Sequence, residues 1–266
     1  MSETGILVIA YARPKLLRLV LESLKRQNAL SNVNVWIDGN AGRKELAGAP
    51  KRCSMVAEEF QVAHIRSHSG HLGIEKLMID ALAVMMDRYD KIIILEDDCF
   101  PTSSAVAEFD SALNDIRDDK TLFSVYGHHF DVPGERPRFS RFQGWGWATW
   151  AEKLKPVHKD IKQLFLLNEE EYLLKIKSMA STDVIDRLDR TPPRYVLRTA
   201  MRQFSWDSCL AVVTASGKLD HAPTHKRVVF NCGLDNKHGH FAPKEALRNP
   251  PFNMIGPNEV WAVFET

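Results

Sequence analysis

Short apolar runs alternate with amphipathic stretches through the first half of the chain. The runs predict strands, because a continuous aliphatic run of this length suits a strand buried on both faces. The stretches with apolar residues three and four positions apart predict helices. The predicted strands are Ile6–Ala10, Val33–Ile37, Val62–Arg66, Ile92–Leu95 and Leu122–Tyr126, and the predicted helices are Lys15–Gln27, Cys53–Phe60, one that begins near Ile74 and one that begins near Ser103.

This alternation predicts an α/β fold with a doubly wound, mostly parallel sheet and helices on both faces. Ligands of such sheets bind at the carboxyl ends of the strands. The second half has a different pattern, which predicts a helical and loop-rich region. Helices are expected over Asp160–Met179, Val196–Phe204 and Ser208–Thr214, and the tail Pro223–Phe241 is expected to be mostly loop.

Composition narrows the class of protein. An apolar fraction of 44% in 266 residues suits a sizeable core, and a formal net charge of +1 argues against a nucleic-acid-binding surface. The four cysteines are far apart and form no C-x-x-C pair, which favours reduced thiols in the cytoplasm. The N-terminus has no signal-peptide pattern, and no apolar segment is long enough to predict a transmembrane helix.

Three acids follow the fourth predicted strand directly. Ile92–Leu95 runs into Glu96, Asp97 and Asp98. Adjacent carboxylates at a buried strand end should repel one another and raise their pKa values, so a positive partner is expected. A divalent cation bridging to a phosphate is the obvious candidate, because hard cations take oxygen ligands. The simpler alternative is a solvated acidic strand end.

Polar residues also follow the second and third predicted strands. Asp38 could accept a hydrogen bond from a nucleotide base or a ribose, or it could be a turn residue beside Gly39. In the segment S-H-S-G-H-L-G-I-E, glycines could let backbone N–H groups face a ligand, with phosphate contacts from Arg66, His68 and Lys76. A plain strand-to-helix connection is the alternative for this segment.

Tryptophan and aspartate mark the second half. Gly144 and Gly146 interleave with tryptophans in G-W-G-W-A-T-W, so Trp145 and Trp147 could stack on a sugar, although clustered tryptophans usually belong to a core. Asp207 follows Trp206 at the start of a predicted helix. It could cap the helix, or it could act as a general base toward an attacking hydroxyl.

These motifs together resemble the GT-A fold glycosyltransferases. The stretches I-L-V-I-A-Y-A-R-P, V-W-I-D-G, I-L-E-D-D-C-F-P, G-W-G-W-A-T-W and S-W-D occur in that family's order, and the similarity covers roughly residues 5–241. The chain is most similar to the inverting N-acetylglucosaminyltransferase-I-like branch and its bacterial relatives. That branch carries E-D-D in place of the D-x-D motif.

The resemblance assigns a role to each matching position. Asp98 would bind the metal, with a looser match of His240 to a histidine near the metal, where His238 competes for the role. Asp207 would be the catalytic base. The donor would contact Ala10, Tyr11 and Arg13 under the nucleotide, Asp38 at the base, Glu96 and Asp97 at the sugar and ribose, and Trp145 and Trp147 in the pocket wall.

The implied activity is metal-dependent, inverting transfer of a hexosyl or N-acetylhexosaminyl group from a nucleotide sugar. The donor would be a UDP-sugar, the metal Mn²⁺ or Mg²⁺, and the acceptor a hydroxyl of a saccharide or glycolipid. The setting would be bacterial surface polysaccharide or glycoconjugate synthesis in the cytoplasm, including the inner face of the membrane. One domain is expected over residues 1–266, with nucleotide binding in about 1–130 and acceptor binding in about 131–266.

Three alternatives stay open. A retaining transferase or a sugar nucleotidyltransferase could use the same sheet and acids, although a nucleotidyltransferase normally opens with a glycine-rich loop that Ala10–Arg13 lacks. A non-catalytic nucleotide-sugar binder is the third. A phosphotransfer receiver is disfavoured, because such α/β units are about half this length.

Overall fold

A seven-stranded sheet organises the described part of the chain. The computed structural model describes residues 3–40, 42–130, 138–189, 205–234 and 244–266. The strands are β1 (Thr4–Ala10), β2 (Val33–Ile37), β3 (His64–Ser67), β4 (Lys91–Glu96), β5 (Cys99–Pro101), β6 (Leu122–Tyr126), β7 (Trp147–Trp150), β8 (Asp220–Pro223) and β9 (Val229–Asn231).

Helices follow most of these strands. They are α1 (Pro14–Arg26), α2 (Ala49–Glu59), α3 (Ile74–Arg88), α4 (Ala105–Asp115), α5 (Ala151–Phe165), α6 (Glu169–Met179), α7 (Thr182–Asp189) and α9 (Trp206–Ser216). Short 3₁₀ turns occupy Leu30–Asn32, Lys44–Leu46, Lys244–Arg248 and Val260–Val263.

The strand order of the main sheet is β3-β2-β1-β4-β7-β6-β8. β7 runs antiparallel to both of its neighbours, and the other pairs in this sheet are parallel. β5 and β9 form a separate antiparallel pair. The predicted α/β class and the mostly parallel, doubly wound sheet are therefore confirmed.

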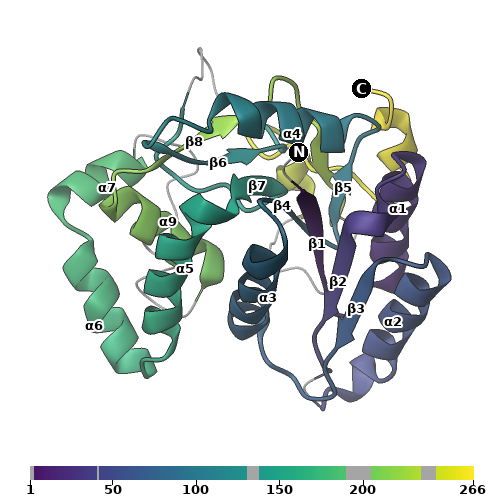
Figure 1. Cartoon of the computed structure of the whole chain (residues 1–266). Coiled ribbons are helices and arrows are strands. Elements are labelled where there is room, and N and C mark those ends of the chain that lie inside the picture. Colours follow the sequence, from purple (N-terminus) through teal and green to yellow (C-terminus); the bar gives the residue numbers. More distant parts are fainter. Residues whose placement is uncertain (1–2, 41, 131–137, 190–204, 235–243) are drawn as a thin grey trace.

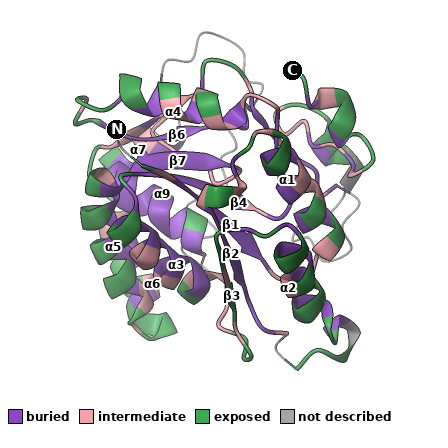
Figure 2. Cartoon of the chain, turned by 45° about the vertical axis from the view of Figure 1, so that its right-hand side comes forward, coloured by how far each residue is buried: buried purple, intermediate pink, exposed green. Residues whose placement is uncertain are grey.

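Helices cover both faces of this sheet (Figure 1). One apolar core packs α1, α2 and α4 against the sheet, and the other packs α3, α5, α6, α7 and α9 against its opposite face. β1, β2, β4, β6 and β7 are almost wholly buried, whereas the edge strand β3 is largely exposed; exposed residues also lie on the outer sides of the helices (Figure 2). This burial explains why the strands read as continuous apolar runs rather than as alternating patterns.

The structure corrects several predicted elements. The third strand is His64–Ser67, two residues later at its start than expected, and the single helix predicted over 160–179 is wrong. Helix α5 ends at Phe165, and Asn168 caps the next helix, α6. The Asn168 side chain accepts from the Glu171 N–H at 2.9 Å, and the Glu171 carboxylate accepts from the Asn168 N–H at 3.2 Å. The described part of the tail is mostly loop, as expected, with the three-residue strand β9 within it, and the predicted helix 196–204 lies outside the described residues.

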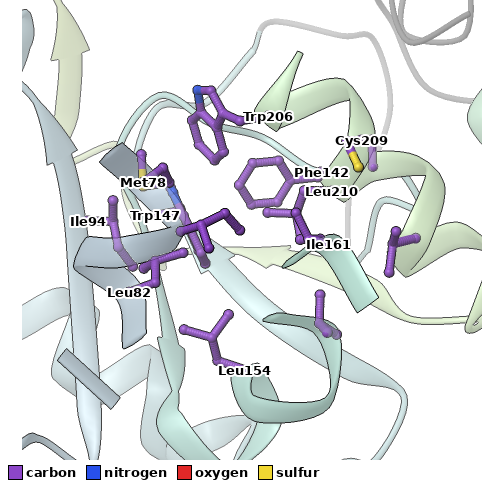
Figure 3. Packing of buried hydrophobic residues seen from close by; sticks show 14 of the residues in the cluster. Met78, Leu82, Ile94, Phe142, Trp147, Leu154, Ile161, Trp206, Cys209 and Leu210 are labelled. Atoms are coloured by element: carbon purple, nitrogen blue, oxygen red, sulfur yellow. The ribbon is translucent and has the colours of Figure 1, made fainter. Parts of the chain in front are cut away.

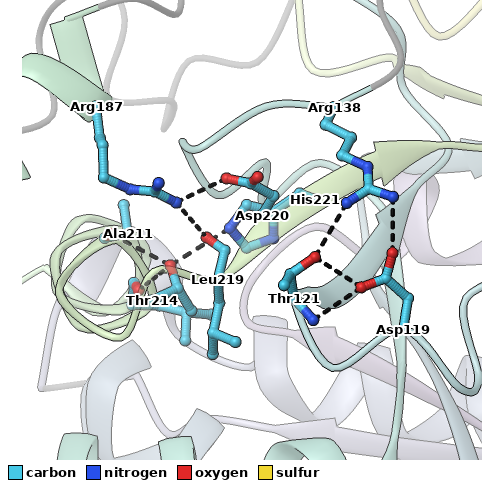
Figure 4. Close-up of polar contacts among 10 residues, drawn as sticks. Asp119, Thr121, Arg138, Arg187, Ala211, Thr214, Leu219, Asp220 and His221 are labelled. Atoms are coloured by element: carbon cyan, nitrogen blue, oxygen red, sulfur yellow. Dashed lines mark hydrogen bonds and ion pairs between the residues drawn. The ribbon is translucent and has the colours of Figure 1, made fainter.

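His221 is a buried polar residue beside the core that α3, α5, α6, α7 and α9 form. His221 on β8 is fully buried, with Nδ1 2.7 Å from the Ser124 hydroxyl and Nε2 3.3 Å from the Thr214 hydroxyl. Figure 4 shows the Thr214 contact beside the ion pair between Arg187 and Asp220. Both ring nitrogens thus have hydrogen-bond partners, which allows a neutral imidazole to be buried here.

All four cysteines are buried and unpaired by disulfides. Within the described ranges, none of the helices has both the length and the apolar character that a membrane crossing requires.

Candidate active site

The three consecutive acids lie at the carboxyl edge of the main sheet. Glu96 ends β4 in register with Ile9 of β1, and the Asp97 N–H donates to the Ile9 carbonyl at 2.9 Å. This backbone pairing fixes where the acids stand. Asp97 and Asp98 are buried, and Glu96 is partly buried.

Arg13 supplies a positive charge between two of these acids. It is the residue before α1, at the end of the loop that leaves β1. Its guanidinium forms ion pairs with Asp97 and, at 2.6 Å, with Oδ2 of Asp98. Burial acts to lower the pKa of Arg13, but the charges of Asp97 and Asp98 outweigh it and hold the pKa well above its ordinary value. Arg13 is therefore a fixed cation at the sheet edge.

The pKa values of two acids are raised, as the sequence predicted. Burial raises the pKa of Glu96 to about 8, the negative charges of Asp98, Asp97 and Asp207 add to this, and Arg13 opposes it. Burial also raises the pKa of Asp97, against the opposing effect of Arg13. The arginine thus relieves only part of the repulsion.

Asp207 joins this group from the other half of the chain. It stands in the first turn of α9, and Ser205, not Asp207, occupies the N-cap position. Oδ1 of Asp207 accepts from the Ser205 hydroxyl at 2.5 Å and from the Ser208 N–H at 2.8 Å. Its negative charge contributes to the raised pKa of Glu96, so the Asp207 carboxylate is within electrostatic reach of that residue.

The segment after β9 packs against Asp98, a contact that the sequence did not predict. Pairing of β5 with β9 brings this segment back to the acids, and the Cys232 N–H donates to the Asp98 carbonyl at 2.8 Å. A Cβ added at Gly233 would lie only 2.7 Å from Oδ2 of Asp98 and 3.1 Å from Oδ1 of Asn231. The one visible signal in the sequence was a glycine in an otherwise irregular tail.

Asp38 is anchored to the loop that precedes α3. Oδ2 of Asp38 lies 2.7 Å from Nδ1 of His71. Gly39 is required beside it, because a Cβ there would meet the Gly70 backbone at 2.4 Å. The Asp38 carboxylate also accepts from the backbone N–H groups of Gly39, Leu72 and Gly73, at 2.8, 2.7 and 3.1 Å. In this conformation the loop before α3 therefore supplies most of the hydrogen-bond partners of the Asp38 carboxylate.

Ala10 and Tyr11 lie between Asp38 and Arg13. The Ala10 carbonyl ends β1 and accepts from the Asp38 N–H at 3.1 Å. The Tyr11 ring packs against His71, with ring centroids 5.7 Å apart. The loop under the predicted nucleotide site is thus in contact with the Asp38 loop.

The three predicted phosphate contacts have other surroundings. The Arg66 guanidinium lies over the Trp36 ring, 4.6 Å from its centroid, and the His68 ring centroid is 5.9 Å from that ring. Lys76 pairs with Asp80 one turn along α3, at 2.9 Å. None of these described contacts joins the three residues to the acids on β4.

The two candidate tryptophans differ. Trp147 is fully buried, and its ring packs near Phe123, Phe142 and Trp206. Figure 3 shows it beside Phe142 and Trp206 in this core. The ligand-facing interpretation is therefore wrong for Trp147, and the core alternative holds. Trp145 is partly buried among His128, Phe130 and Phe252 and is still available as a pocket wall. His240 and His238 lie outside the described residues.

The acids fit a hard divalent cation in one particular way. Oδ2 of Asp97 is buried without a hydrogen-bond partner. No cluster of three or more His, Cys, Asp or Glu placed to hold a metal occurs in the part of the chain that the structure describes. Mg²⁺ commonly takes only one or two carboxylates and completes its shell with substrate phosphates and water. The donor set suits a metal that arrives with a diphosphate rather than a closed protein cage.

Comparison with known proteins finds no matching family model and no matching curated sequence. Among solved structures, TarS 1–349 from S. aureus aligns at 10% identity and TM-score 0.48, over 88% of this chain and 61% of that one. A mannosyltransferase from Pyrobaculum calidifontis in complex with GDP-Man and Mn²⁺ aligns at 13% identity and TM-score 0.45, over 92% of this chain and 78% of that one.

Glucosyl-3-phosphoglycerate synthase from Mycobacterium tuberculosis, with Mg²⁺ and UDP, aligns at 11% identity and TM-score 0.39, over 57% of each chain. The chain thus spans less than two thirds of the mycobacterial and staphylococcal structures. At these identities and TM-scores the likeness assigns neither a family nor a reaction to this chain.

Proposed function

We propose that the protein is a metal-dependent, inverting glycosyltransferase that moves a sugar from a nucleotide donor, a UDP-sugar, to an acceptor hydroxyl. One observation carries the proposal. The acids that end β4 and Asp207 on α9 come from distant parts of the sequence, yet the charge of Asp207 contributes to the raised pKa of Glu96. This electrostatic coupling of Glu96 and Asp207 supports a shared site for the acids at the end of β4 and the proposed base.

Asp207 is the proposed base. Ser205 and the Ser208 N–H hold Oδ1, whereas Oδ2 accepts no hydrogen bond from the residues that the structure describes. A carboxylate with one tethered oxygen and one open oxygen has a fixed orientation and a free proton acceptor. Oδ2 would take the proton of the acceptor hydroxyl as that oxygen attacks the anomeric carbon from the face opposite the leaving group.

Asp98 is the proposed metal ligand, with Asp97 and Glu96 beside it and His240 as a further candidate. A bound Mn²⁺ or Mg²⁺ would stabilise the negative charge of the leaving nucleoside diphosphate. Arg13 would hold Asp97 and Asp98 in place and add positive charge at the same edge. Glu96, with a pKa of about 8, would be largely protonated near neutral pH in the metal-free protein and could donate a hydrogen bond to a donor hydroxyl.

The nucleotide is proposed to lie over Ala10 and Tyr11, with its base toward Asp38. Since the loop before α3 occupies the Asp38 carboxylate, a base would have to exchange one of these bonds. The bond to His71 is the most readily exchanged, because 39% of the His71 side chain is exposed. Arg66, His68 and Lys76 stay candidates for phosphate contacts, and Trp145 for the pocket wall.

We assign donor binding and acceptor binding to different halves of the chain. Residues of about 1–130 would bind the donor, and residues of about 131–266 would bind a saccharide or glycolipid acceptor. Synthesis of a bacterial surface polysaccharide or glycoconjugate is the proposed setting, and the cytoplasm the proposed location.

A donor screen tests the reaction class. The full chain would be incubated with UDP-, GDP- and CDP-sugars and simple acceptors, with Mn²⁺ or with EDTA, and nucleoside diphosphate release would be measured. Metal-dependent release of UDP is expected, and the product's anomeric configuration, read by NMR, should be opposite to the donor's. Retained configuration would indicate a retaining enzyme, pyrophosphate release from a nucleoside triphosphate and a sugar phosphate would indicate a nucleotidyltransferase, and tight donor binding without turnover would indicate a binder.

A further inference from the structure

A hollow of about 200 Å³ opens on the face of the sheet that α3 covers, beside the edge strand β3. Its wall combines apolar surface with polar and cationic side chains. The residues that form this wall are Asn34, Trp36, His64, Ile65, Arg66, Val84 and Arg88.

Strand register explains the hollow. Asn34 pairs with His64, and Trp36 pairs with Arg66, so these side chains of β2 and β3 point to the same face. α3 packs on that face through Trp36 and the apolar side of the helix, and it ends at Arg88. The outermost part of the sheet is therefore left without a covering helix.

Two arginines that line the hollow, Arg66 and Arg88, have no acidic partner among the residues that the structure describes. The Arg66 guanidinium lies over the Trp36 ring, 4.6 Å from its centroid, and Arg88 stands in the last turn of α3. In the described structure neither arginine forms an ion pair with a carboxylate. The acid one turn before Val84 on the same helix, Asp80, is already paired with Lys76, and Asp87 does not line the hollow.

We propose that this hollow is a second anion site, which binds a phosphate-bearing ligand between Arg66 and Arg88. Two guanidinium forks favour a phosphate dianion, because each fork matches two phosphate oxygens. His64 and the Asn34 side of the wall add polar groups, and the open edge beside β3 leaves room for the rest of the ligand. The site is separate from the acids at the end of β4, since β2 and β1 lie between β3 and β4, and here Arg66 binds this second anion in place of the donor phosphates.

The phosphate could be carried by a free small molecule or by a lipid headgroup. Pyrophosphate is the probe for the first source, and vesicles that contain phosphatidic acid are the probe for the second. Isothermal titration calorimetry of the full chain with pyrophosphate, in EDTA and at low salt, measures the first. Co-sedimentation with the vesicles measures the second.

Matched arginine variants separate this site from the others. Arg66→Ala and Arg88→Ala should each weaken pyrophosphate binding by at least tenfold, the loss expected for one charged hydrogen-bonding partner. The control is Arg117→Ala, because Arg117 also stacks on a tryptophan, 4.9 Å from the Trp150 ring centroid, but does not line the hollow. Its affinity should stay within about twofold of the wild type. Arg13→Ala reports on the candidate active site and should leave this binding intact.

The outcomes are distinct. Loss in both hollow variants with retention in the Arg117 and Arg13 variants supports the proposal, and vesicle binding with the same variant pattern supports it with a lipid as the source. Unchanged affinity in Arg66→Ala and Arg88→Ala overturns it, as does the absence of binding to both probes. Arg88 lies at an exposed helix end, so Arg88→Ala gives a clear reading even if Arg66→Ala disturbs the packing of Trp36.

Discussion

The proposed role of Asp207 as the general base can be tested by a single substitution. Asp207→Asn should fold normally, because the amide oxygen can still accept from the Ser208 N–H. The amide cannot take a proton, so kcat should fall by roughly 10²–10⁴-fold while donor affinity stays nearly unchanged. Steady-state kinetics and donor titration measure the two quantities.

Asp183→Asn is a suitable control, since Asp183 occupies the first turn of α7 in a similar way and should be dispensable. Turnover by Asp207→Asn within a few-fold of the wild type would contradict the base assignment and the inverting mechanism with it.

Gly233 tests the contact that the sequence analysis missed. In Gly233→Ala the new methyl group would stand 2.7 Å from Oδ2 of Asp98, so the carboxylate must shift. Mn²⁺ affinity in the presence of UDP should weaken by at least about tenfold, because a displacement of this kind is costly in a preorganised site. Gly217→Ala is the control, since its Cβ would make only ordinary contacts of 3.5 Å or more. Equal Mn²⁺ affinity in both variants would mean that Asp98 does not bind the metal.

Residue chemistry was predictable only where it depended on local sequence. The raised pKa values of Glu96 and Asp97 followed from three adjacent acids after a buried strand. The ion pairs of Arg13 join residues more than eighty positions apart, and nothing in the local sequence indicates them. The same holds for Asp38, whose partners lie in a loop more than thirty positions later.

At the scale of elements, the break between α5 and α6 depends on one capping box. Asn168→Ala removes the acceptor for the Glu171 N–H and should reduce the free energy of unfolding by about 1 kcal/mol. For a chain of this size, the thermal midpoint should fall by roughly 2–4 °C. Asn168→Asp keeps an acceptor oxygen and should restore the midpoint. An unchanged midpoint in the alanine variant would mean that packing alone ends α5.

Long apolar strands were predictable, and short strands were not. β1, β2, β4 and β6 are continuous runs of buried residues, so the local sequence is enough to predict them as strands. β7 has four residues and follows Gly146, and β5 and β9 have three each, so their identity depends on partners far along the chain. The continuous helical pattern over 160–179 concealed the cap at Asn168.

For the whole molecule, buried histidines should make the fold sensitive to acid. Burial lowers the pKa of His221 from 6.5 to about 3, so between these values the unfolded chain binds a proton that the folded chain refuses. Stability should therefore fall as the pH drops from 6.5 toward 3, by up to about 1.4 kcal/mol per pH unit from this residue. Urea unfolding at a series of pH values measures the slope, and His221→Gln should flatten it.

His225 provides a control of opposite sign. Its surface ion pairs with Asp115 and Glu108 raise its pKa, so its contribution is present below about pH 6.5 and is lost as the pH rises through the folded-state pKa. His225→Gln should therefore lower stability by a constant amount below about pH 6.5 and leave the slope of the acid decline unchanged. An identical slope in the wild type and His221→Gln would show that His221 accepts a proton in the folded state.

The position of β7 has a consequence for the order in which the sheet is assembled. β7 stands between β4 and β6, although it follows both of them in the sequence. While the ribosome is still adding residues before Trp147, β4 therefore has an apolar, unpaired edge, and β6 has no neighbour through which to join the parallel strands. The emerging chain carries a half-built sheet that cannot close until β7 is inserted, and during that interval the exposed edge of β4 is a surface that molecular chaperones could protect.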